Sequence, residues 1–268
     1  MANLHGCAVT DITVGTHLVK DHDVKGLLFD CDGTLLDSMP LFYKSWVATS
    51  GKFGLSLSEE EFYGYAGMPL PDIVRSMHRT QKGSECTEAF IADFLKEKKK
   101  AHHGIEAKVG SPRPIECVVR IARDAEARGI PIAVATSGLR DHVEAHLSSA
   151  GLSDLFNSKR ANVVCAVDVP QGKPAPDIFV EAAKRIGVDP RACRAYEDGE
   201  SGLQSAFAAG CQVIDCTKMP SYPTCSGLQK SKEVSAKQRT WHLATDKKPA
   251  AAESWWAFLE CSCAANRK

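Results

Sequence analysis

The sequence predicts an α/β protein with a doubly wound parallel sheet and a small helical cap domain inserted after the first strand. Two observations lead to this fold class. From residue 113 to residue 216, short apolar runs alternate with segments of helical spacing, which is typical of parallel strands joined by crossover helices. Residues 40–108 instead mix polar and apolar residues at helical spacing with few strand-like runs, which indicates an inserted helical domain.

The composition does not point to a nucleic acid, a membrane or a zinc ion as a partner. The 268-residue chain has 33 basic and 33 acidic residues, so its zero net charge gives no electrostatic reason to expect nucleic acid or an anionic membrane. No apolar stretch approaches the roughly 18 residues that span a bilayer. The 11 cysteines include no Cys-x-x-Cys pair and several lie in apolar segments, which favours reduced thiols in the cytoplasm. Cys261 and Cys263 have no nearby histidine and make a poor zinc site.

The first strand is expected at Gly26–Phe29, a short apolar run that delivers Asp30 to its carboxyl end. Residues 1–24 contain several aspartates and lack a basic region followed by an apolar one. They therefore match neither a secretory signal nor a transit peptide, and we expect a short disordered leader.

The elements after the insertion are predicted in order. Pro114 opens a helix whose apolar face includes Ile115 and Val118, and Gly129 closes it. The next helix ends at Gly151, and two more are expected over about 176–186 and 201–209. The strands expected between these helices are Ile130–Ala135, Val163–Val167, Cys193–Tyr196 and Gln212–Cys216.

These elements divide the chain into a core formed by residues 25–38 and 110–222 and a cap formed by residues 39–109. After about Tyr222 the periodicity fades, and residues 223–268 are polar and rich in lysine. We expect a C-terminal tail with one docking helix. The apolar island that predicts this helix consists of Trp255, Trp256, Phe258 and Leu259.

Four polar clusters follow predicted strands, and each has a functional and a structural interpretation. The first, residues 30–37, contains Asp30 and Asp32 in a tight turn. One carboxylate can attack phosphorus while the other donates a proton, although an aspartate in such a turn is often only structural. The second, Thr136-Ser137-Gly138, offers a hydroxyl and backbone amides to a phosphate oxygen, or simply caps a helix.

The third cluster, residues 172–177, holds Lys173 before two prolines and a helix start. Its ammonium can neutralise a nucleophile and a phosphate together, and the alternative is an ordinary surface lysine. The fourth, residues 197–202, begins with Glu197 and Asp198, whose oxygens suit Mg²⁺ or, alternatively, cap a helix start. All four clusters in order, each on its own strand of one sheet, are not expected by chance.

With these four motifs the sequence resembles the haloacid dehalogenase superfamily of hydrolases over about residues 25–218. The resemblance implies a Rossmann-like core in which Asp30 is the nucleophile and Asp32 is the general acid and base. A dehalogenase usually lacks the second aspartate, so Asp32 favours phosphate chemistry. The groups that the resemblance implies for binding phosphoryl oxygens are Thr136, Ser137 and Lys173. The implied Mg²⁺ ligands are Asp30, the main-chain carbonyl of Asp32, Asp198 and, either as a ligand or as a neighbour of one, Glu197.

The inserted segment resembles the small helical cap of the branch that includes β-phosphoglucomutases and sugar-phosphate phosphatases. Closing of such a cap excludes bulk water and selects the leaving group. β-Phosphoglucomutases carry a histidine where this chain has Phe42 and an arginine where it has Leu70. Without these two groups a distal phosphate is poorly held, which favours hydrolysis over mutase chemistry. Residues 172–177, 197–198 and 213–216 are similar to those of fructose-1-phosphate phosphatases and their relatives.

The last cap helix raises two further questions. Lys98 falls where these relatives often place a substrate-facing lysine, but the charge run of residues 96–100 also fits a solvated helix face. The His102-His103 pair has no spaced acidic partner and is expected at the surface.

Three functional hypotheses follow. The first is a Mg²⁺-dependent phosphomonoester hydrolase that acts on a small phosphorylated sugar, as a cytoplasmic monomer without nucleic acid or membrane partners. The second is a β-phosphoglucomutase-like sugar-phosphate mutase. The third is a catalytically inactive protein that uses the same fold for partner binding, and only the C-terminal tail offers it any support.

Overall fold

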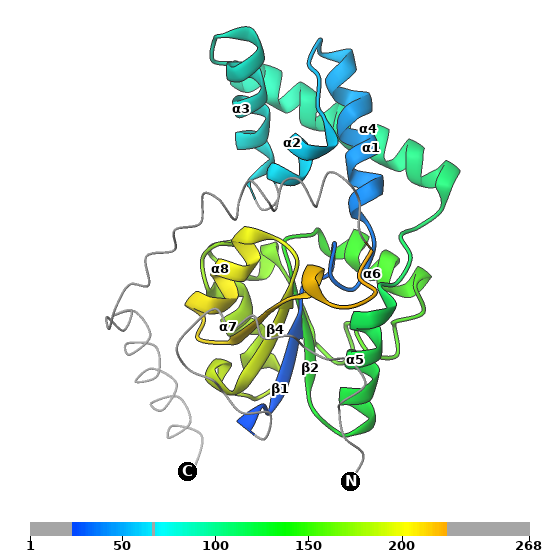
Figure 1. Ribbon diagram of the computed structural model, residues 1–268, viewed down its shortest axis with the longest axis vertical. Helices are drawn as coiled ribbons and strands as arrows, with labels where there is room; N and C mark the ends of the chain where they lie inside the picture. The colour runs from blue at the N-terminus through cyan, green and yellow to red at the C-terminus, as the bar shows by residue number, and fades with distance from the viewer. Residues whose placement is uncertain (1–22, 66–67, 224–268) are drawn as a thin grey trace.

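The computed structural model describes residues 23–65 and 68–223, which form a parallel sheet covered by helices and a helical unit beyond the carboxyl ends of the strands (Figure 1). The five strands pair in the order β3-β2-β1-β4-β5, and every pair is parallel. The strands are β1 (Gly26–Phe29), β2 (Ile132–Thr136), β3 (Val163–Cys165), β4 (Cys193–Glu197) and β5 (Gln212–Asp215). The predicted fold class, an α/β protein with a doubly wound parallel sheet, is confirmed.

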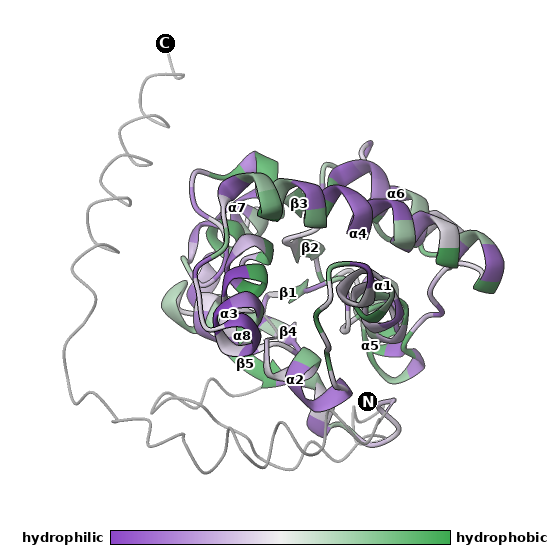
Figure 2. Cartoon of the chain, turned by 90° about the horizontal axis from the view of Figure 1, so that it is seen from above, coloured by the Kyte–Doolittle hydropathy of each residue, from purple (hydrophilic) through white to green (hydrophobic). Residues whose placement is uncertain are grey.

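Helices cover both faces of this sheet, α5 and α6 on one side and α7 and α8 on the other (Figure 2). Alternate strand residues explain the two layers: Phe29 and Val134 pack with the first pair of helices, and Leu28 and Ala133 with the second. Because these strands are buried on both faces, their consecutive residues are apolar, and this explains the continuous apolar runs in the sequence. The helices are α5 (Glu116–Ala127), α6 (Arg140–Ser149), α7 (Asp177–Arg185) and α8 (Glu200–Ala208), with short 3₁₀ turns η2 (Ala166–Asp168), η3 (Pro190–Ala192) and η4 (Cys216–Lys218).

Two strand boundaries differ from the prediction by two residues, because of local hydrogen bonds, and the ends of β2, β4 and β5 differ by one residue. The strand expected from Ile130 begins at Ile132, since the Ile130 N–H still bonds to the Ala125 carbonyl at the end of α5. The strand expected to reach Val167 ends at Cys165, where the chain turns into η2 and the Asp168 carboxylate accepts a hydrogen bond from the Cys165 N–H (2.9 Å).

The helical unit has a hydrophobic cluster of its own. Trp46 is 3% exposed and Phe94 is fully buried, and their ring centroids lie 5.5 Å apart. Two of the helices begin at side-chain caps, Ser58 with Glu61 and Thr87 with the Phe90 N–H. This separate cluster supports the proposed division into a core and a cap. The four helices are α1 (Met39–Lys52), α2 (Glu59–Gly64), α3 (Leu70–Lys82) and α4 (Glu88–Val109).

Several expectations concern parts of the chain outside the described residues. The leader up to residue 22 and the apolar island of the C-terminal tail both lie there. Within the described ranges, none of the helices has the length and apolar character needed to span a membrane. Cys31, Cys165 and Cys216 are buried thiols of the core, in agreement with a structural role for the cysteines.

Replacement of Phe94 by alanine tests the packing of the helical unit. Because Phe94 is fully buried, Phe94→Ala should lower the free energy of unfolding by about 3–5 kcal/mol, measured by urea denaturation. Phe207→Ala in α8 is the matched control, since Phe207 is 52% exposed and its loss should change stability by no more than about 0.5 kcal/mol. Equal effects of the two substitutions would contradict the assigned cap core.

Candidate active site

The sheet brings the four polar clusters to one place. Asp30 directly follows β1, and its N–H donates to the Tyr196 carbonyl of the neighbouring β4 (3.0 Å). Thr136 ends β2 and Glu197 ends β4, on either side of β1. The strand order changes direction between β1 and β4, and doubly wound proteins bind ligands at this switch point.

The loop after β1 is shaped by close contacts with the other strand ends. Gly33 has φ = +87°, and a Cβ at this position would lie 2.2 Å from Asp198 Oδ2, so only glycine fits. The Thr34 hydroxyl donates to Asp198 Oδ1 (3.1 Å). The Tyr222 hydroxyl donates to the Gly33 carbonyl (2.5 Å), so the chain just after the last strand helps to hold this loop. Nothing in the sequence pattern indicated this role of Tyr222.

Lys173 lies between two carboxylates at the centre of the site. Its Nζ is 2.5 Å from Asp30 Oδ1 and 2.6 Å from Glu197 Oε1, and its side chain is only 5% exposed. The interpretation of Lys173 as a surface lysine is therefore wrong. Burial alone would lower the pKa of Lys173, but the charges of Asp30 and Glu197 raise it above its ordinary value, so the side chain is a permanent cation.

Glu197 orients its neighbours through both carboxylate oxygens. While Oε1 contacts Lys173, Oε2 accepts hydrogen bonds from the N–H groups of Asp198 and Gly199, each 2.9 Å long. These bonds fix the turn that carries Asp198. They favour an orienting role for Glu197 over direct coordination of a metal.

Asp32 and the second cluster lie on the other side of Asp30. Asp32 is partly exposed, and within the described ranges its Oδ1 has no hydrogen-bond partner. A Cβ on Gly138 would lie 3.4 Å from Asp32 Oδ2, which places this carboxylate beside the loop after β2. In that loop the buried Thr136 hydroxyl accepts a hydrogen bond from the Gly138 N–H (3.0 Å). The proton of this hydroxyl is therefore left to donate to another acceptor. Ser137 is exposed.

The charges of the site favour a divalent cation. Asp30, Glu197 and Asp198 can bring oxygen atoms within 4.8 Å of one another, and together with the Lys173 ammonium they leave two negative charges unbalanced. Burial accordingly raises the pKa of Asp30 to about 7 and that of Asp198 well above its ordinary value, with the neighbouring carboxylates adding to both shifts. A hard cation such as Mg²⁺ fits this set of oxygen donors.

Lys98 of the helical unit also faces this region. Its Nζ lies 5.1 Å from the Phe42 ring centroid and 5.7 Å from that of Trp46. Burial lowers the pKa of Lys98, and the charge of Asp32 opposes that shift. A solvated helix face therefore describes the exposed Lys99, whereas Lys98 is only partly exposed.

Gly202→Ala tests the fixed position of Glu197. A Cβ on Gly202 would lie 1.6 Å from Glu197 Oε1, an oxygen held by Lys173, so the carboxylate would have to move. We expect the free energy of unfolding to fall by about 1–3 kcal/mol in urea titrations. Gly104→Ala is the control, because its Cβ would meet no atom within 4 Å and alanine should stabilise α4 by about 0.5–1 kcal/mol. A Gly202→Ala protein as stable as wild type would rule out the clash.

Comparison with known proteins is consistent with this site. A fructose-1-phosphate phosphatase from Escherichia coli, YqaB, is 32% identical over 190 residues, which is 71% of this chain and 95% of that protein. A haloacid dehalogenase-type hydrolase of family IA from Entamoeba histolytica has a TM-score of 0.61 at 26% identity, covering 71% of this chain and 83% of that one.

A third relative is CbbY from Rhodobacter sphaeroides, solved in complex with xylulose-(1,5)bisphosphate. It has a TM-score of 0.59 at 25% identity and covers 71% of this chain and 85% of that one. The model of the haloacid dehalogenase-like hydrolase family matches residues 24–210, a segment that includes β1, all four polar clusters and the helical unit. The chain therefore belongs to the family of haloacid dehalogenase-like hydrolases.

Proposed function

We propose that the protein is a Mg²⁺-dependent phosphomonoester hydrolase that acts on a small sugar phosphate through a phospho-aspartyl intermediate. The observation that carries this proposal is the contact of Lys173 with Asp30 and Glu197 at the switch point of the sheet, next to Asp198. A buried cation beside a carboxylate at this position suits an incoming phosphoryl group, because it lowers the repulsion between two anions.

In the proposed reaction an Asp30 carboxylate oxygen attacks phosphorus and the bond to the leaving oxygen breaks. Asp32, whose Oδ1 has no partner within the described ranges, gives its proton to that oxygen. Asp32 then removes a proton from water, whose oxygen attacks phosphorus, and the bond between phosphorus and the Asp30 oxygen breaks, which releases phosphate and restores the Asp30 carboxylate. Lys173, Thr136 and Ser137 would hold the phosphoryl oxygens. Bound to Asp30, the Asp32 carbonyl and Asp198, Mg²⁺ would supply positive charge that offsets the negative charge of the reacting groups.

The substrate class is inferred from the helical unit and from the relatives. The unit lies over the strand ends (Figure 1). Its Lys98 lies close enough to interact electrostatically with Asp32, and its ammonium is beside the Phe42 ring, a cation and an apolar group suited to a polar phosphorylated metabolite. YqaB is named as a fructose-1-phosphate phosphatase, and the CbbY structure is a complex with xylulose-(1,5)bisphosphate. Both relatives support a sugar phosphate as the substrate.

Mutase chemistry is less well supported. A mutase has to hold a second phosphate, and the two positions where mutases have a histidine and an arginine carry Phe42 and Leu70 here. Leu70 is 44% exposed at the start of α3 and offers no hydrogen-bond donor from its side chain. The monomeric state and the cytoplasmic location remain predictions. A purely binding role is disfavoured, because Asp30, Lys173, Glu197 and Asp198 all lie together at the strand ends.

The nucleophile is tested by Asp30→Asn. We expect purified wild type with Mg²⁺ to release phosphate from fructose 1-phosphate or a related sugar phosphate, and Asp30→Asn to be slower by at least about 1,000-fold, because the amide cannot attack phosphorus. Asp93→Asn, at an exposed position of α4, is the control and should retain full activity. No Mg²⁺-dependent phosphate release across a broad panel of phosphate esters would refute the proposal.

In a second arm of this experiment, glucose 1,6-bisphosphate is added to a hexose 1-phosphate. Hydrolysis predicts release of phosphate without accumulation of the hexose 6-phosphate. Stimulated isomerisation without phosphate release would instead support the mutase.

The charge balance of the site predicts a pH effect on stability. In the metal-free protein the pKa of Asp30 is raised from 3.8 to about 7, so the folded state holds a proton that the unfolded chain releases in this range. The contribution of Asp30 to stability is thus complete below about pH 4 and is lost as the pH rises through about 7. With a chelator present, wild type should lose stability relative to Asp30→Asn between about pH 5 and pH 8, as measured by urea denaturation.

Saturating Mg²⁺ should remove this loss, because the cation stabilises the ionised carboxylate. Parallel stability curves for wild type and Asp30→Asn in the chelator would show that Asp30 keeps an ordinary pKa. The same measurement on Asp93→Asn should reproduce the wild-type slope.

A further inference from the structure

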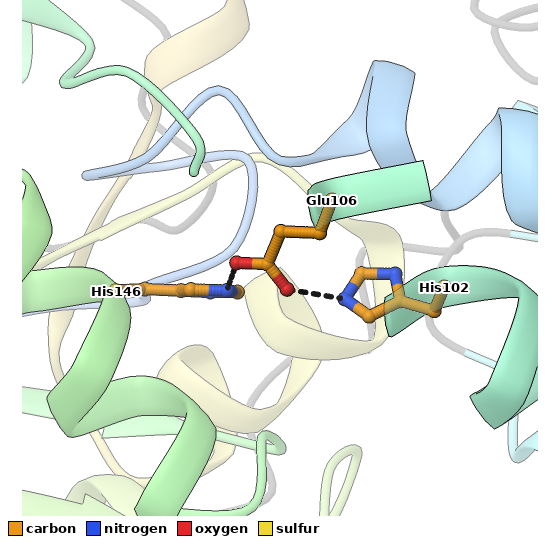
Figure 3. Close-up of side chains that lie close together, drawn as sticks. All are labelled: His102, Glu106 and His146. Atoms are coloured by element: carbon orange, nitrogen blue, oxygen red, sulfur yellow. Dashed lines mark hydrogen bonds and ion pairs between the residues drawn. The ribbon is translucent and has the colours of Figure 1, made fainter. Parts of the chain in front are cut away.

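A second group of metal-ligating side chains lies between the helical unit and the core, on α4 and α6. His102 and Glu106 lie one helical turn apart on α4, and His146 lies on α6. Figure 3 shows the Glu106 carboxylate between the two imidazole rings. Its Oε1 is 2.8 Å from His146 Nε2 and its Oε2 is 3.8 Å from His102 Nε2, and the ligand atoms of all three residues lie within 4.8 Å of one another.

This cluster corrects the expectation that the His102-His103 pair lies at the surface without an acidic partner. His103 is exposed, but His102 is only 4% exposed and Glu106, four residues later, is its spaced acid. His146, which follows Glu106 by 40 residues in the chain and lies on α6, is 6% exposed.

His102 is buried, and the ring nitrogen that faces Glu106 is its Nε2. Its Nδ1 has no hydrogen-bond partner in the part of the chain that the structure describes, and it is the nitrogen that would keep the proton of a neutral ring whose Nε2 binds a metal ion. An imidazole with an ordinary pKa of about 6.5 is mostly neutral at pH 7. A neutral imidazole can give the electron pair of its Nε2 to a metal ion.

The chemistry of the donors differs from that of the carboxylate site. Two imidazole nitrogens and one carboxylate are typical ligands of Zn²⁺, whereas Mg²⁺ prefers oxygen alone. Bonds of about 2.0–2.1 Å in a tetrahedral site place ligand atoms roughly 3.3 Å apart. One ligand atom from each of the three residues lies within 4.8 Å of the other two, so side-chain movements of about 1.5 Å or less bring the ligand atoms to this separation.

We propose that His102, Glu106 and His146 form a Zn²⁺ site that fastens α4 to α6. Three protein ligands leave a fourth position for water or another small ligand. His103 and His142, whose ring centroids lie 4.9 Å apart, border the site but are not among its ligands. Since α4 ends at Val109 and the chain then returns to the core, Zn²⁺ would fix the angle at which the helical unit is joined to the sheet domain.

Zinc binding can be tested by titration of the full chain in excess Mg²⁺ against a chromophoric chelator. Wild type should bind one equivalent of Zn²⁺. The affinity of Glu106→Gln and of His146→Gln for Zn²⁺ should be at least about 100-fold lower than that of wild type. Glu106→Gln keeps the size of the side chain, so its folding should be unaffected. The matched control, His103→Ala, removes a histidine from the same helix and should keep the full affinity.

The cysteines of the chain require a separate control. Co²⁺ in place of Zn²⁺ should give visible d–d bands without the near-ultraviolet charge-transfer band of a thiolate ligand. A Cys261→Ser/Cys263→Ser variant should bind the same equivalent. A thiolate band that disappears in this variant would move the site to the tail and overturn the proposal.

The fastening of α4 to α6 has its own readout. Zn²⁺ should raise the Tm of wild type and slow amide hydrogen exchange in residues 110–113, and both effects should be absent in Glu106→Gln. Failure of wild type to bind Zn²⁺, or equal binding by wild type, Glu106→Gln and His146→Gln, would refute the site. Because none of these measurements uses a phosphate ester, they stand or fall independently of the proposed hydrolase activity.

Discussion

The contact of one buried ammonium with two buried carboxylates holds the proposed active site together. Lys173 reaches Asp30 at the end of β1 and Glu197 at the end of β4, so it joins segments that are 143 and 24 residues away in sequence. Removing one partner of a buried ion pair commonly costs about 3–5 kcal/mol, because the other charge is left uncompensated. The convergence of the strand ends is therefore both a feature of stability and the arrangement that a phosphoryl group requires.

The same convergence leaves the site short of positive charge. Three carboxylates share one ammonium, and the raised pKa values of Asp30 and Asp198 express the cost of ionising these groups together without a further cation. A divalent cation would supply the missing positive charge, and it would also offset the negative charge of a bound phosphoryl group. The helical unit adds to this effect by covering the strand ends, because interactions between charges are stronger where bulk water is excluded.

The sequence predicts the parts of this structure that depend on regular patterns. Strands buried on both faces are visible as apolar runs, and residues at their ends meet because parallel strands point the same way. Asp30, Thr136 and Glu197 were predicted on this basis. The start of β2 and the end of β3 were not predicted. Single hydrogen bonds, such as that from the Cys165 N–H to Asp168, decide where these strands begin and end. Contacts such as Tyr222 with Gly33, 189 residues apart, depend on tertiary packing and leave no periodic signal.

Helix α4 links the two candidate sites because it contributes to both. Lys98, which faces Asp32, lies one turn before His102, and Glu106 lies one turn further on. Side chains four residues apart on a helix share a face, so a rotation of α4 that moves Glu106 away from α6 also moves Lys98 away from the strand ends. A bond between α4 and α6 would thus hold a cap cation over the phosphoryl site. The position of this single 22-residue helix sets both the junction of cap and core and the charge above Asp32.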